Sequence, residues 1–94
     1  MLSTTKTECP ALAAVCVSQA GRDKGNTYII IKVESPEFVL VADGKTKTVS
    51  NPKKKRFKHI KTIPNLVAID LLPKILDNKL VDNEIHKFLL KVKI

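Results

Sequence analysis

The feature that most limits the fold of this chain is a series of short apolar stretches, each ended by residues that break a strand. Residues 27–34 carry Tyr28, three consecutive isoleucines and Val33, a composition typical of a β-strand. A further apolar stretch lies on each side, at residues 12–18 and 37–42. Together these stretches predict three successive strands in the first half of the chain.

The segments between these strands favour tight turns. A glycine-bounded loop at residues 20–25 separates the first two strands, and a Ser-Pro pair at residues 35–36 separates the second from the third. An Asp-Gly pair at residues 43–44 suits a hairpin, because both residues tolerate positive φ. A fourth, half-exposed strand is expected at residues 45–49, where lysine alternates with threonine. Sequential strands joined by tight turns predict an antiparallel meander.

A fifth short strand is expected at residues 59–63. Five short strands leave unprotected edges unless the sheet closes on itself, so a small five-stranded antiparallel barrel is predicted over residues 11–63. Residues 1–10 are expected to form a flexible tail that ends at Pro10. The start of this tail is polar and lacks the apolar region of a signal peptide, which favours the cytosol. The predicted fold class is mainly β with a C-terminal α part.

Residues 64–94 have the character of helices, and we expect one or two short helices packed on or beside the barrel. Asn65 is a candidate N-cap for a first helix, which Pro73 would kink or split. Asp82 is a candidate N-cap for the last helix. That last helix would carry one apolar stripe, formed by Ile85, Phe88, Leu89 and Val92.

The charge of the chain is strongly unbalanced. Its 94 residues fit one domain and include 17 Lys and Arg against 9 Asp and Glu, a formal net charge of +8. Such a charge favours a polyanion or an anionic membrane as partner. The membrane is the weaker alternative, because no amphipathic helix with aromatic residues adjoins the basic residues 53–58, and no stretch approaches the roughly 20 apolar residues of a membrane span. The expected location is the cytoplasm.

No pattern in the chain predicts catalysis, a metal or a cofactor. Cys9 and Cys16 lack CxxC spacing and a histidine nearby, so no metal site is expected. His59 and His86 have no nucleophile or carboxylate at a recognisable spacing. We therefore expect a binding protein that is not an enzyme, with no cofactor and no small-molecule substrate.

Two segments are candidates for contact with a polyanion, and the first is the basic run at residues 53–58. It is expected to form a loop between two strands, and each of its cations can neutralise a phosphate. The alternative is a solvated charged loop without a partner. Phe57 within the run either stacks on a base or belongs to the barrel. The cations are Lys53, Lys54, Lys55, Arg56 and Lys58.

The second candidate is the glycine-bounded loop. Arg22 and Lys24 would face phosphate oxygens, and Asp23 would order the loop by accepting hydrogen bonds from backbone N–H groups. Gly21 and Gly25 would supply positive φ and a close approach of the backbone. The alternative is an ordinary β-turn. The loop is not a nucleotide-binding P-loop, because the Gly-Lys-Ser/Thr ending and the following helix are missing.

The segment Val15–Gly25, with the sequence VCVSQAGRDKG, and the apolar strand after it resemble the KOW motif of a family of small bacterial RNA-binding proteins. These proteins look like a large-subunit ribosomal protein of archaea and eukaryotes. Residues 40–45 and 51–60 also match the pattern of the family, so the resemblance covers residues 12–63. One departure is Ala13, which stands where the family usually carries a glycine.

The resemblance implies an SH3-like β-barrel that contacts ribosomal RNA, with ribosomal proteins as further partners. Structured RNA would be recognised mainly by shape and charge, because an RNA duplex hides its major-groove edges. The alternative is a protein–protein interaction module that uses the barrel and the apolar stripe of the last helix. Gly21, Asp23 and Gly25 would set the geometry of the loop. The expected RNA-binding residues are Ser18, Arg22, Lys24, Lys45, Lys47, Lys53, Lys54, Lys55, Arg56 and Lys58.

Overall fold

The computed structural model describes residues 10–92. The predicted tail at residues 1–10, which includes Cys9, therefore lies outside the described residues except for Pro10. The elements, in chain order, are β1 (Ala14–Ser18), β2 (Thr27–Val33), β3 (Phe38–Ala42), β4 (Lys53–Arg56), the 3-10 turn η1 (Phe57–His59), β5 (Ile60–Val67), α1 (Leu72–Leu76) and α2 (Asp82–Lys91).

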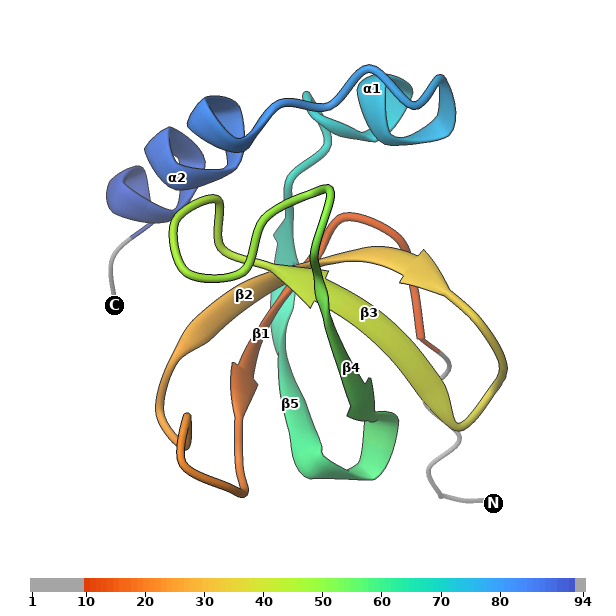
Figure 1. The fold of residues 1–94 in the computed structure, drawn as a ribbon, viewed down its shortest axis with the longest axis vertical. Helices are drawn as coiled ribbons and strands as arrows, with labels where there is room; N and C mark the ends of the chain where they lie inside the picture. Colours follow the sequence, from red (N-terminus) through yellow and green to blue (C-terminus); the bar gives the residue numbers. More distant parts are fainter. Residues whose placement is uncertain (1–9, 93–94) are drawn as a thin grey trace.

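The five strands form one antiparallel sheet in the order β4-β3-β2-β1-β5, and the two helices lie across one end of it (Figure 1). The predicted fold class, mainly β with short C-terminal helices, is confirmed. Each of the first three strands pairs with the next in sequence, as expected for a meander. The fifth strand returns to pair with β1.

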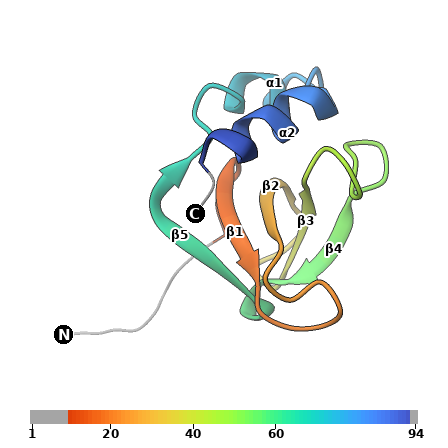
Figure 2. The same cartoon turned by 90° about the vertical axis from the view of Figure 1, so that its left-hand side faces the viewer.

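The sheet is curled but not closed into a barrel. Figure 2 shows β5 and β4 at its two edges, and η1 joins them without a ladder of hydrogen bonds. The prediction of a closed barrel is therefore wrong. Closure is one way to protect sheet edges, but a short edge strand rich in lysine is another. The second solution applies here, because β4 has only four residues and all of them are basic.

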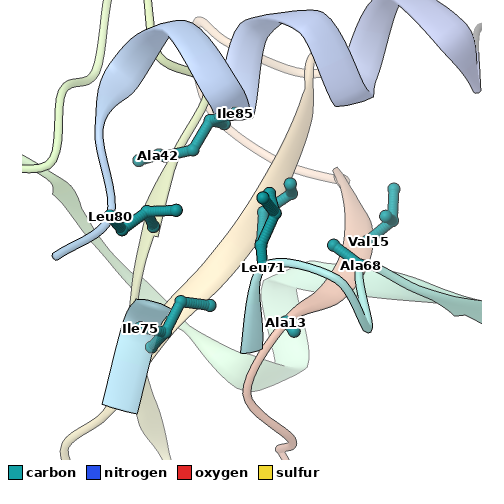
Figure 3. Packing of buried hydrophobic residues seen from close by; sticks show 9 residues of the cluster. Ala13, Val15, Ala42, Ala68, Leu71, Ile75, Leu80 and Ile85 are labelled. Carbon is teal, nitrogen blue, oxygen red and sulfur yellow. The ribbon is translucent and has the colours of Figure 1, made fainter. Parts of the chain in front are cut away.

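Both faces of the sheet are buried in part. One face, which we call the helix face, carries Val15, Ile29 and Ala42, and α1 and α2 cover it. Figure 3 shows Leu71 and Ile85 among the side chains that fill the space between the helices and this face. The opposite face carries a second cluster, formed by Ala14, Cys16, Tyr28, Ile30, Val39, Val41 and Ile60.

The predicted strand at residues 45–49 is a loop. The Asp43 Oδ1 atom accepts hydrogen bonds from the backbone N–H groups of Lys45, Thr46 and Lys47, at 2.8–2.9 Å. Partial burial would raise the pKa of Asp43, but these hydrogen bonds lower it. Because one carboxylate satisfies three donors that a ladder would otherwise use, the chain turns here and resumes pairing only at β4.

The start of the helical part also differs from the prediction. Asn65 caps no helix: it lies within β5 with a φ of 64°, a conformation that asparagine tolerates. As a result, the predicted boundary at residue 63 falls inside this strand. Pro73 does not split a helix either, since it lies in the first turn of α1, where its missing N–H costs nothing. The N-cap of α2 is Val81, and Asp82 is its first residue.

The last helix is attached to the sheet by its apolar stripe. Ile85 is fully buried, and Phe88 and Leu89 pack against the same core cluster. Lys74 and Glu84 form an ion pair between the two helices. The protein's own core therefore covers Ile85, Phe88 and Leu89 of this stripe, while the alternative of a protein–protein interaction module stays a prediction.

Ala13, which precedes β1, has a φ of 70° and a fully buried side chain. A left-handed backbone conformation destabilises alanine by about 1 kcal/mol relative to glycine. Burial of the Ala13 methyl group stabilises the fold by about 0.8 kcal/mol, so the two effects nearly cancel. We therefore expect Ala13→Gly to change the free energy of unfolding by less than about 0.5 kcal/mol. Ala14→Gly, a buried position without positive φ, should lower it by about 1–2 kcal/mol in thermal unfolding. If Ala13→Gly and Ala14→Gly lower the free energy of unfolding equally, the backbone at Ala13 is not strained.

Candidate nucleic-acid interface

The loop that joins β1 to β2, residues 19–26, is closed by its own backbone. The Gly25 N–H donates to the Ser18 carbonyl, and the Ser18 N–H donates to the Asn26 carbonyl, both at 2.9 Å. Gly21 and Gly25 have φ values of 89° and 92°, the positive region that the sequence predicts for them. The loop is therefore a defined turn that only glycine at these two positions permits without strain.

Asp23 is the centre of a hydrogen-bond network that extends from this loop to β4. Its Oδ1 atom accepts hydrogen bonds from the Ser18 hydroxyl and the Lys55 ammonium, both at 3.0 Å. Its Oδ2 atom accepts one from the Tyr28 hydroxyl at 2.8 Å. Lys55 also donates to the Ala20 carbonyl at 3.2 Å. Asp23 thus orders the loop through three side chains instead of the predicted backbone N–H groups.

The network fixes the charges of its members. Burial alone would raise the pKa of Asp23, but the hydrogen bonds from Lys55, Tyr28 and Ser18 outweigh it and lower the pKa from 3.8 to about 2. Burial and the bond to Asp23 raise the pKa of Tyr28 to about 12. Burial also raises the pKa of the Cys16 thiol to about 12, against the opposing effect of Lys55. At neutral pH Asp23 is therefore an anion, paired with a largely buried cation.

The low pKa of Asp23 predicts a loss of stability in acid. A carboxyl group whose pKa is lower in the folded state stabilises the fold above its unfolded pKa, and this contribution disappears as the pH falls through the folded pKa. With 3.8 unfolded and about 2 folded, Asp23 should contribute about 2 kcal/mol at neutral pH, lost between about pH 5 and pH 2. NMR titration of the Asp23 carboxyl carbon measures the midpoint directly. A midpoint near 3.8 would contradict the network.

Two predicted RNA-binding residues are almost completely buried. Ser18 is 1% exposed and Lys55 is 8% exposed, and the polar groups of both are engaged within the network. Their structural role is to hold the loop against β4. That they contact RNA directly stays a prediction.

Residues 53–56 of the basic run form strand β4 and not the predicted loop, and Lys58 lies in η1. Because successive side chains of a strand point to opposite faces, the cations of β4 are divided between the two faces of the sheet. Lys53 and Lys55 lie on the face opposite the helices. Lys54 and Arg56 lie on the helix face, where the Lys54 Nζ and Arg56 Cζ atoms are 4.8 and 5.0 Å from the centroid of the Phe38 ring.

A hollow of about 470 Å³ lies between the β1–β2 loop, the 43–52 loop and β4. We call it the basic hollow. It brings Arg22, which is exposed, together with Lys47 and Lys53, which are half-buried and lie much later in the sequence. Its lining residues are Gly21, Arg22, Asp23, Asn26, Tyr28, Thr46, Lys47, Lys53 and Lys55.

The other predicted cations lie elsewhere on the surface. All of them are exposed, and none lines the basic hollow: Lys24, Lys45, Lys54, Arg56 and Lys58. The structure thus separates the predicted set into a group that converges and a group that does not.

Tyr28 belongs to the site, although the sequence assigned it only to a strand. A buried tyrosine hydroxyl usually finds a hydrogen-bond partner. Tyr28 is the only tyrosine in the chain. It lies near the beginning of an apolar strand, directly after a loop that contains an acidic residue. That combination is the signal from which the bond to Asp23 was predictable.

Comparison with known proteins adds no assignment. No model of a known protein family matches the chain, and no curated protein matches it in sequence. Within residues 10–92, no group of three or more His, Cys, Asp and Glu side chains is placed to hold a metal ion. The helices of this part of the chain are also too short or too polar to cross a membrane.

Proposed function

We propose that this protein is a cytoplasmic RNA-binding protein of the KOW type that binds structured RNA, in the first instance ribosomal RNA, through phosphate contacts in the basic hollow. The observation that carries the proposal is the convergence of Arg22, Lys47 and Lys53 in one hollow beside a rigid glycine loop. The formal net charge of +8 adds long-range attraction to any polyanion. The choice of ribosomal RNA rests on the resemblance alone.

The network around Asp23 supports this proposal because it holds the loop backbone that carries Arg22. Arg22 lies between Gly21 and Asp23, and Asp23 is bound to β2 and β4 through Tyr28 and Lys55. A guanidinium on a rigid support can hold phosphate oxygens in one orientation with two parallel hydrogen bonds. Lysine is a point charge that accepts many geometries. Arg22 would therefore supply discrimination, and the lysines would supply affinity.

Removal of the hollow's lysines should weaken RNA binding and its salt dependence together. We expect the double variant Lys47→Ala/Lys53→Ala to bind a short RNA duplex about ten-fold more weakly at low salt. The slope of log K against log[salt] should become less steep by about 2, since each phosphate contact contributes about 0.9. Fluorescence anisotropy over a salt series gives both quantities.

The matched control is Lys87→Ala/Lys91→Ala, which removes the same charge from exposed positions on α2. It should leave the slope nearly unchanged. If both double variants change the slope equally, the hollow is not the phosphate site. A slope near zero for the unmodified protein, with every RNA tested, would reject RNA binding through phosphates altogether.

A further inference from the structure

A second, smaller hollow lies beside β4, and it has a different chemistry. Its volume is about 220 Å³, and it shares no residue with the basic hollow. It forms where the β2–β3 turn meets η1, and the Phe57 N–H closes this junction by donating to the Glu37 carbonyl at 2.7 Å. Its lining residues are Pro36, Glu37, Arg56, Phe57 and Lys58.

The walls of this hollow offer flat surfaces that are held in place. Phe57 is half-buried and packs against the core cluster of the face opposite the helices, so its ring has a fixed support. Arg56 is held near the Phe38 ring, at 5.0 Å from its centroid. Pro36 adds a rigid apolar surface. Aromatic rings and guanidinium planes are the two surfaces on which proteins stack unpaired bases of RNA.

Glu37 is an acidic residue in a hollow whose other charged residues are both basic. It is exposed and lines the hollow together with two cations, yet its carboxylate forms no ion pair within residues 10–92. Glu34, nearby in the sequence, is paired with Lys54 at 3.4 Å. A carboxylate weakens binding to a phosphate, so it is better suited to the donor groups of a base.

We propose that this hollow, which we call the base pocket, binds one unstacked guanine of an RNA strand. The inference rests on the proposed function, because it assumes an RNA ligand. The N1–H and N2–H groups of guanine point in the same direction and match the two oxygens of the Glu37 carboxylate. Uracil instead presents one N–H between two carbonyl oxygens, which a carboxylate repels. Stacking would come from Phe57 and Arg56, and Lys58 would meet the adjoining phosphate.

The position of the pocket suits an RNA that already contacts the basic hollow. Lys55 and Arg56 are consecutive residues of β4 that point to opposite faces. The η1 turn links both sites: the Gln19 N–H of the glycine loop donates to the His59 carbonyl at 2.8 Å, while Phe57 bonds to Glu37. An RNA that contacts both sites would pass around β4, which is an edge strand of the sheet, and its unpaired nucleotide would enter the base pocket there.

The test compares Glu37→Gln with Glu34→Gln, a variant that removes the same charge outside the pocket. The probes are an oligouridine strand with one guanine, the same strand with inosine, which lacks the N2 amino group, and plain oligouridine. We expect the unmodified protein and Glu34→Gln to prefer guanine over both other strands by about ten-fold. Glu37→Gln should reduce this preference to less than about two-fold, and the ratio is insensitive to the change in net charge.

A blunt RNA duplex without unpaired nucleotides separates this inference from the proposed function. If the duplex binds with steep salt dependence but the three strands bind equally, the base pocket is wrong and phosphate binding stands. A guanine preference that survives in Glu37→Gln also overturns the pocket. If neither the duplex nor any strand binds, the proposed function fails, and the base pocket fails with it.

Discussion

Replacement of Asp23 by alanine is expected to lower the free energy of unfolding by about 3–4 kcal/mol. Within residues 10–92, the substitution leaves the Lys55 ammonium, 8% exposed, with the Ala20 carbonyl as its one remaining acceptor. It also removes the Asp23 acceptor of the Tyr28 hydroxyl and one of the two acceptors of the Ser18 hydroxyl, which keeps the Ala20 carbonyl. An uncompensated buried charge costs about 3–5 kcal/mol when one partner of a buried pair is removed. Urea denaturation at neutral pH measures the loss.

A double-mutant cycle shows whether the loss of stability in Asp23→Ala arises because the buried Lys55 ammonium is left without its anion. Lys55→Met keeps an unbranched side chain, one atom shorter and without the ammonium, and leaves Asp23 its two hydroxyl donors, so we expect a smaller loss of about 2 kcal/mol. The variant that carries both changes should lose at least 1 kcal/mol less than the sum, because neither charge is left alone. Asp70→Ala, at an exposed position, should stay within about 0.5 kcal/mol. If the losses of the two single variants simply add in the double variant, Asp23 and Lys55 do not stabilise the fold as an ion pair.

The same substitution links stability to recognition. Without Asp23, the loop loses its bond to Tyr28 of β2 and its ion pair with Lys55 of β4, so the backbone that carries Arg22 is held less firmly. Asp23→Ala should therefore resemble Arg22→Ala in RNA binding: affinity for a structured target falls more than affinity for generic RNA. If the ratio between the two RNAs stays unchanged in both variants, Arg22 is not the discriminating residue.

The strands with a strong apolar pattern were predictable from the sequence alone. The stretch at 27–34 became β2 and the stretch at 37–42 became β3, each within two residues of its predicted bounds. The physical reason is that buried β-branched residues leave few alternatives to a strand. The two Gly positions with positive φ, 21 and 25, were predictable for a similar reason, because the glycine-bounded loop is short.

The segments at 45–49 and 53–56 were assigned the wrong way round, and both errors arise from tertiary structure. The alternation of lysine and threonine imitates an exposed strand, but the Asp43 carboxylate captures the N–H groups of the first of these segments. The basic run looks like a solvated loop, yet its pairing with β3 makes it a strand. Nothing in the local sequence distinguishes Lys55 from Lys53 and Lys54. It is the buried lysine because it pairs with Val39 of β3.

The candidate site was predictable in its residue types but not in its grouping. Arg22 and Lys53 lie on segments more than thirty positions apart, and they meet because the sheet curls. The same curl places Lys47 beside them, while the alternation of β4 sends Lys54 and Arg56 to the other face. A sequence shows which cations exist, whereas the topology determines which of them share a surface.

The second large effect is expected at Gly44, where the 43–52 loop meets α2. Gly44 has a φ of 78°, and a Cβ atom there would lie 2.9 Å from the His86 backbone nitrogen and still closer to the Asp82 carbonyl oxygen. Because both atoms belong to the backbone of α2, no side-chain rotation can relieve the overlap. Left-handed strain of about 1 kcal/mol and overlap of about 1–3 kcal/mol predict a total loss of about 3 kcal/mol for Gly44→Ala.

Gly25→Ala is the matched control, because it separates backbone strain from overlap. Gly25 has a comparable φ of 92°, but a Cβ atom there meets nothing within 4 Å. The Gly25→Ala variant should therefore lose only about 1 kcal/mol of the free energy of unfolding, measured by thermal unfolding. Hydrogen exchange should show faster opening of α2 in Gly44→Ala and not in Gly25→Ala. Equal losses in the two variants would mean that α2 does not lie against the loop.

The Gly44 variant also tests what the C-terminal helix contributes to the site. The Val49 N–H donates to the Asp82 carboxylate at 2.7 Å, so α2 holds the loop that carries Lys47 into the basic hollow. A displaced helix should release this loop and move Lys47 away. We therefore expect Gly44→Ala to weaken binding of an RNA duplex about as much as Lys47→Ala does, although Gly44 has no charge to lose. Full RNA affinity in a Gly44→Ala protein with a displaced α2 would show that the helix stabilises the fold without supporting the interface.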